Sequence, residues 1–72
     1  MQVTLVIEEE GSGREEEQTV DVDEDAAVGD VLDAAGINPE TVLVERDGSI
    51  VPTDADLDGA EELRVLEVIS GG

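Results

Sequence analysis

The apolar residues of segment 28–35 have the spacing of a helix, and segments with the pattern of extended strands lie before and after it. Gly36 suits the position that ends such a helix, and Ile37 then folds back as an apolar contact. The helix has about ten residues at most, so it must be held by packing against other elements. Its apolar face is predicted from four residues at i, i+3, i+4 and i+7: Val28, Val31, Leu32 and Ala35.

The residues before the helix are typical of a β-hairpin. Val3, Leu5 and Ile7 alternate with other residues, which is the period-2 pattern of a strand with one buried face. Residues 14–22 resume an extended pattern after a turn at 11–13. Two glutamate runs, 8–10 and 15–17, are then expected to face each other across the hairpin, at a cost in stability.

Three more extended segments follow the helix. Residues 41–46 alternate, with Val42 and Val44 on one face and Leu43 and Glu45 on the other. Asp47-Gly48 is a strong hairpin signal, and it predicts a short edge strand at 49–51 that Pro52 ends. Residues 53–61 are expected to form a loop that could include a helical turn around Leu57. A final strand is expected to start at Glu62.

This order of elements predicts an α+β fold: a mixed sheet of four to five strands with one helix packed across one face. The crossover through the helix predicts that the first and last strands pair in parallel. We expect residues 1–69 to form this domain and Ser70, Gly71 and Gly72 to form a flexible tail. Glycine suits a close approach by another macromolecule, because it has no side chain.

The composition excludes several kinds of chemistry. The 72 residues contain no Phe, Tyr, Trp, Cys or His, so the core must consist of Val, Leu, Ile and Ala. Thiol nucleophiles, Cys/His zinc sites and imidazole catalysis are therefore excluded. We expect no enzyme activity, no cofactor and no metal. No apolar run approaches the roughly 20 residues that span a bilayer, and no signal peptide is recognisable, so we expect a cytoplasmic protein.

The charge is strongly acidic, with 21 Asp and Glu against three Arg and a formal net charge of −18. Nucleic acid and anionic membranes are poor partners for such a surface. The surface also repels itself, and at about 1 M salt the Debye length of about 3 Å screens that repulsion. We therefore expect a monomer from a salt-rich, halophilic cytoplasm. Lysine is absent, so the N-terminus is the chain's only amine acceptor.

Two acidic motifs offer rival hypotheses. Asp54, Asp56, Asp58 and Gly59 match the first half of an EF-hand calcium loop, but the bidentate Glu that the loop requires is replaced by Val65. A calcium-binding module is thus a minor alternative. Carboxylate catalysis of the glycosidase kind needs a carboxyl group in an apolar pocket. A chain of this size has no room for both a pocket and a core.

Across its whole length the chain resembles the ubiquitin-like, β-grasp proteins, most closely the haloarchaeal small modifier proteins. Those modifier proteins in turn resemble the sulfur carriers of molybdopterin and thiamine synthesis, so this chain is similar to the carriers as well. The residues that carry the resemblance are 28–32 and 36–37 around the helix, 44–52, 57–59, 63–66 and the terminal Gly71-Gly72.

The resemblance implies that an activating enzyme uses ATP to adenylate the carboxylate of Gly72, which Gly71 helps to present. The acyl group then passes to lysines of target proteins, which makes the chain a modifier. Alternatively it passes to sulfur, which makes the chain a sulfur carrier for molybdopterin, thiamine or tRNA thiolation. A sulfurtransferase or the large subunit of molybdopterin synthase would then be a partner.

An apolar patch is predicted beside the tail. Leu43, Leu66 and Val68 fall on the sheet face opposite the helix, and exposed apolar patches mark partner sites. With Ser70 they form the predicted partner-binding surface. A register shifted by one residue would instead place them in the core.

Overall fold

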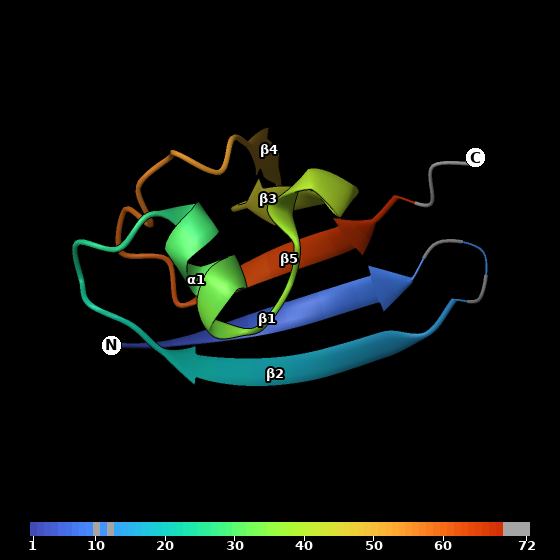
Figure 1. Cartoon of the computed structure of the whole chain (residues 1–72), viewed down its shortest axis with the longest axis horizontal. Coiled ribbons are helices and arrows are strands. Elements are labelled where there is room, and N and C mark those ends of the chain that lie inside the picture. Colours follow the sequence, from blue (N-terminus) through green and yellow to red (C-terminus); the bar gives the residue numbers. More distant parts are fainter. Residues whose placement is uncertain (10, 12, 69–72) are drawn as a thin grey trace.

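The computed structural model describes residues 1–9, 11 and 13–68, and it has the predicted order of elements. A hairpin comes first, then the helix, a short 3₁₀ turn and three more strands (Figure 1). The bounds are β1 (Gln2–Glu9), β2 (Glu15–Asp21), α1 (Val28–Ala34), η1 (Pro39–Thr41), β3 (Val42–Arg46), β4 (Ser49–Val51) and β5 (Glu62–Glu67).

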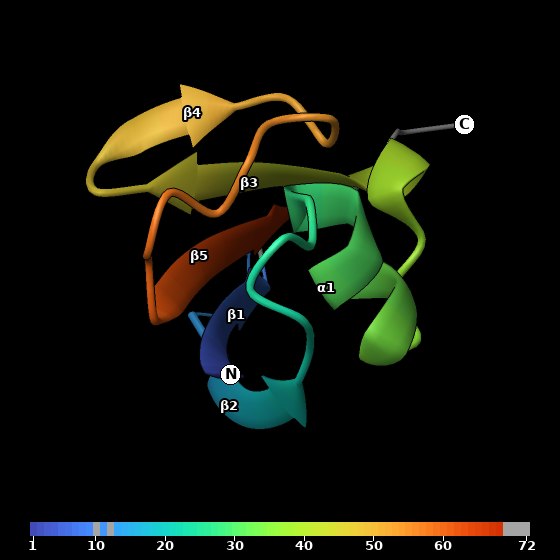
Figure 2. The same cartoon turned by 90° about the vertical axis from the view of Figure 1, so that its left-hand side faces the viewer.

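The strands form one mixed sheet in the order β2-β1-β5-β3-β4. β1 and β5 pair in parallel at its centre, which confirms that prediction, and the other pairs are antiparallel. The helix lies across one face of the sheet (Figures 1 and 2). We call this face the covered face and the opposite one the open face.

The helix ends as its sequence predicts. Gly36 has a positive φ of 75°, which glycine adopts without the steric cost that a Cβ brings. The N–H of Gly36 donates to the carbonyl of Asp33 at 3.0 Å, and the N–H of Ile37 donates to that of Leu32 at 2.9 Å. These two bonds define a Schellman motif.

The start of the helix depends on distant residues. The N–H of Val28 donates to the carbonyl of Ala55 at 2.9 Å, and that of Gly29 to the carbonyl of Thr53 at 2.7 Å. Both donors would otherwise lack a partner within the helix. The loop between β4 and β5 therefore caps the helix.

That loop also corrects one prediction. Residues 53–61 contain turns but no helical turn around Leu57, and the side chain of Leu57 is 1% exposed. Leu57 is part of the core because its loop folds against the start of α1. The other buried core residues are Val3, Leu5, Ala26, Val28, Val31, Leu32, Val44, Leu63 and Val65.

The hairpin register corrects a second prediction. Glu8 lies opposite Glu15, but Glu16 lies opposite Ile7 and Glu17 opposite Val6. The two glutamate runs therefore do not face each other as triplets. The reason is the longer connection, in which the N–H of Glu9 donates to the carbonyl of Arg14 at 3.0 Å.

Candidate partner-binding site

The open face carries three apolar side chains at one end of the sheet. Leu43 of β3 pairs with Leu66 of β5, and both lie on the side opposite the buried Val44 and Val65. Val68 follows Leu66 on the same side, and its N–H donates to the carbonyl of Thr41 at 3.0 Å. Leu43 and Val68 are each 43% exposed, and Leu66 is half-buried. They are thus outside the core, as the alternation predicted.

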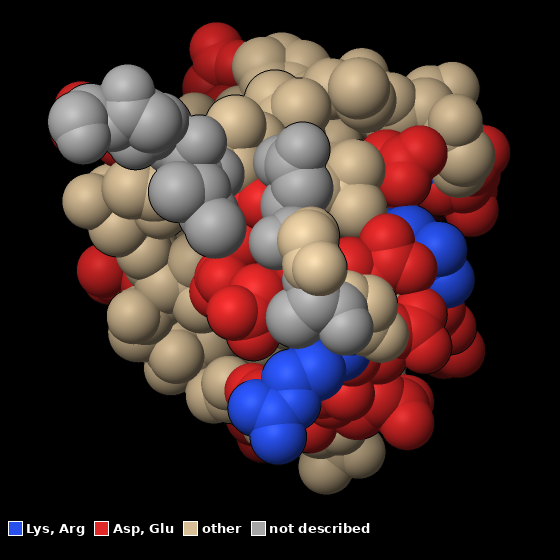
Figure 3. Space-filling model, turned by 90° about the vertical axis from the view of Figure 1, so that its right-hand side faces the viewer, with Lys and Arg blue, Asp and Glu red and all other residues tan. Residues whose placement is uncertain are grey.

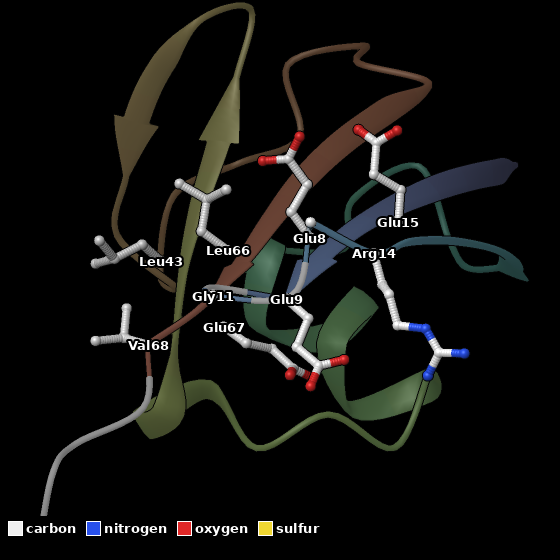
Figure 4. A pocket seen from close by; sticks show the side chains of 10 residues that line it. Glu8, Glu9, Gly11, Arg14, Glu15, Leu43, Leu66, Glu67 and Val68 are labelled. Atoms are coloured by element: carbon white, nitrogen blue, oxygen red, sulfur yellow. The ribbon is translucent and has the colours of Figure 1, made fainter.

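The three side chains line one open hollow of about 480 Å³ at the ends of β1 and β5 (Figure 4). Arg14 lies on its β2 side. Figure 4 shows Glu8 and Leu66 on one side of the sheet and Glu9 and Glu67 on the other, so the hollow wraps around the sheet end. Its complete lining is Glu8, Glu9, Gly11, Gly13, Arg14, Glu15, Leu43, Leu66, Glu67 and Val68.

The border of the hollow is acidic, a feature that was not predicted from the sequence. Figure 3 shows this end of the molecule, where many Asp and Glu side chains lie among uncharged ones and beside arginine. Arg64 lies beside the hollow on the open face; its Nη1 is 2.9 Å from Oε1 of Glu8, and its Nη2 is 3.9 Å from Oε1 of Glu15. The alternation of β1 and β5 hinted at this border, but only the strand pairing brings these residues together.

In the sequence, the predicted tail comes shortly after Val68, which belongs to this site. Val68 is the last described residue, and it lines the hollow. Ser70, predicted for partner contact, and Gly71 and Gly72, predicted for adenylation, lie outside the described residues. Their role stays a prediction.

The described residues do not assemble a metal site. No group of three or more carboxylates in the described part of the chain is placed to hold a metal ion. Val65, where a calcium loop needs a glutamate, is buried in β5. None of the helices in the described ranges is long and apolar enough to cross a membrane.

The fold and this site define a class of protein: a five-stranded mixed sheet with one helix across it is the β-grasp, ubiquitin-like fold. The chain belongs to the small archaeal modifier protein 2 family, whose model matches residues 1–69. This is a family of protein modifiers rather than of enzymes.

Solved structures agree with this assignment. SAMP1 from Haloferax volcanii is 26% identical, with a TM-score of 0.63 over 96% of this chain and 99% of that one. Ubiquitin from Caldiarchaeum subterraneum is 16% identical, with a TM-score of 0.64 over the full length of both chains, and this likeness concerns the fold.

One curated relative matches part of the chain. An uncharacterized protein from Archaeoglobus fulgidus is 49% identical over 43 residues. The match covers 60% of this chain and 63% of the relative, which is less than two thirds of the relative's length.

Proposed function

We propose that this chain is a ubiquitin-like modifier whose Gly72 carboxylate is adenylated by an activating enzyme and joined to lysines of target proteins. The family match over residues 1–69 is the observation that carries the proposal. The hollow at the end of β5 supports it, because this apolar surface directly precedes the terminal residues in the sequence.

The chemistry that we propose needs a partner enzyme. A carboxylate is a poor electrophile, so its oxygen must first become part of a good leaving group. Attack of the Gly72 carboxylate on the α-phosphate of ATP gives an acyl adenylate and releases pyrophosphate. A lysine amine of the target then attacks the acyl carbon, releases AMP, loses a proton and forms the isopeptide bond. The modifier supplies a narrow arm, and the activating enzyme supplies the catalytic groups.

We propose that the activating enzyme docks on Leu43, Leu66 and Val68, with Ser70 leading into the reactive end. These apolar side chains are exposed outside the core, and removing them from water would favour association. A Leu66→Asp variant should therefore fold normally and show weakened enzyme binding. An unfolded variant would contradict this role for Leu66, because it would mean that Leu66 serves the core.

Mass spectrometry of the protein from its source cells tests the fate of the carboxylate. Arg64 is the last lysine or arginine in the chain. Trypsin should therefore leave residues 65–72 attached to each modified lysine, rather than a bare Gly-Gly. Target peptides with this branch are expected. A free terminus heavier by the difference between sulfur and oxygen, without branched peptides, would instead assign a sulfur carrier.

A reconstituted assay tests the activation step. The chain with its activating enzyme should catalyse exchange of pyrophosphate into ATP, and deletion of Gly71 and Gly72 should abolish this exchange. A Ser49→Ala variant is a suitable control, because Ser49 lies on the edge strand β4, away from the hollow. Exchange that survives the deletion would overturn the proposal.

We further propose a salt-rich cytoplasm as the setting of this modifier. The net charge of −18 destabilises the compact state by self-repulsion, which salt screens. The free energy of unfolding should therefore rise between dilute buffer and molar KCl. Full stability in dilute buffer at neutral pH would contradict the proposed setting and leave the modifier function standing.

A further inference from the structure

We propose that the hollow binds a partner segment in which aliphatic side chains are flanked by lysine or arginine. This inference rests on the proposed function and deepens it, because it names the chemistry of the partner surface. The observation behind this inference is that the strand register divides the hollow into an apolar half and an acidic half.

The division follows one row of residues across four strands. Glu15 of β2 pairs with Glu8 of β1, Glu8 with Leu66 of β5, and Leu66 with Leu43 of β3. Side chains in one such row lie on the same face of a sheet. The β3–β5 half of the row is therefore apolar and the β1–β2 half is acidic. Val68 extends the apolar half.

Arg64 holds the acidic half in place. Its guanidinium contacts the carboxylates of both Glu8 and Glu15. These contacts engage the arginine and orient two carboxylates that would otherwise repel each other across the hairpin. Arg64 is thus a positioning residue. The four glutamates of the lining outnumber Arg14 and Arg64, so the border of the hollow has an excess of negative charge.

The end of the sheet adds two further carboxylates. Glu9 and Glu67 are register partners on the parallel pair β1–β5, and both are exposed. Among the described residues neither has an ion-pair partner. Like charges on neighbouring strands destabilise each other, and a cation between them would relieve this repulsion. A lysine or arginine of a partner, placed beside an aliphatic side chain in the apolar half, fits both parts of the hollow.

Other occupants match this surface less well. A second copy of the chain would bring acidic borders together, and nucleic acid or an anionic membrane would bring phosphates against carboxylates. A cationic and aliphatic protein segment is the class that complements both the charge and the apolar area.

Binding of short synthetic peptides to the full chain tests the inference without the activating enzyme. The probe carries two leucines flanked on both sides by lysines. One matched peptide has glutamate in place of each lysine, and another has serine in place of each leucine. Binding is followed by nuclear magnetic resonance in molar KCl. The lysine–leucine peptide should shift the amide signals of Leu43, Leu66 and Val68, and each matched peptide should bind about tenfold more weakly.

Two pairs of substitutions separate a specific site from general attraction. Glu9→Gln with Glu67→Gln removes two charges at the hollow. Asp23→Asn with Asp25→Asn removes two exposed charges near the opposite end of the sheet, outside the lining of the hollow. The first pair should weaken binding of the lysine–leucine peptide by about threefold to fivefold, because molar KCl screens exposed charges, and the second should leave it within about 1.5-fold.

Several results would overturn the inference. One is that both pairs of substitutions weaken peptide binding equally, and another is that the glutamate peptide binds as tightly as the lysine–leucine peptide. The others are amide shifts centred on another face of the domain, or no binding of the lysine–leucine peptide. The proposed function fails by a different result, namely absence of pyrophosphate exchange with the activating enzyme. Because the peptide assay contains no enzyme, the two failures are distinguishable.

Discussion

The two faces of the sheet use the same kinds of aliphatic residue for different purposes. On the covered face Val3, Leu5, Leu63 and Val65 are fully buried beneath the helix. On the open face Leu43 and Val68 are 43% exposed, and glutamates line the same hollow. A hydrophobic side chain stabilises the fold only by the apolar area that folding removes from water. The comparison therefore indicates that the covered face stabilises the domain and that the open face remains available for binding.

The largest loss of stability is expected for Leu63→Ala on the covered face. Leu63 is 0% exposed, and removing a buried leucine costs about 2–5 kcal/mol because lost burial and a cavity add together. A domain of this size is stabilised by roughly 0.05–0.15 kcal/mol per residue, so this loss is a large part of the total. Denaturant unfolding in molar KCl measures it. A cost below about 1 kcal/mol would show that the core repacks around the site.

A smaller effect is expected for Gly36→Ala, where the helix that covers the sheet ends. The positive φ of 75° should cost alanine about 1–2 kcal/mol, although the space for a Cβ is open. The matched control is Ala34→Gly in the last turn of α1, which tests helix propensity with a normal backbone. Thermal unfolding of both variants checks the prediction. An unchanged melting temperature for Gly36→Ala would contradict the Schellman ending.

On the open face Arg64→Gln should lower the free energy of unfolding by less than about 1 kcal/mol in molar KCl, because its ion pairs are half exposed and screened. The loss should grow at lower salt, where Glu8 and Glu15 repel each other more strongly. A KCl series of denaturation curves for the two proteins measures this difference. A loss that is independent of salt would mean that Arg64 acts mainly through packing.

The smallest effect is expected for Leu43→Thr on the open face. Threonine introduces a β-branched side chain, which suits a strand, and exposed substitutions usually change stability by no more than about 0.5 kcal/mol. The same variant should lose affinity for the activating enzyme. Unfolding curves paired with binding curves separate the two effects. If Leu43→Thr destabilised the domain as much as Leu63→Ala, the distinction between the faces would be wrong.

Local features of the fold could be read from the sequence. Gly36 and Ile37 end the helix as predicted, and Asp47 and Gly48 form their hairpin turn with positive φ values of 53° and 84°. These features depend on residues close together in the chain. The alternation along β3 and β5 also placed Leu43 and Leu66 correctly, because side chains in a strand change face at each residue.

The acidic half of the candidate site could not be predicted from local sequence patterns. Arg64 and Glu8 are separated by 56 positions in the sequence, and their contact requires β5 to lie beside β1 in one particular register. The burial of Leu57 was missed for a similar reason, since its loop carries no periodic pattern to indicate which side faces the core.

The sequence by itself determined the helix, the order of the extended segments, the apolar side of β1, β3 and β5 and the excess of negative charge, because these follow from local spacing and composition. Only the tertiary structure decided which carboxylates border Leu43, Leu66 and Val68 and which carbonyls cap the start of α1. Contacts between distant residues depend on strand order and register, and neither quantity is encoded in any single segment.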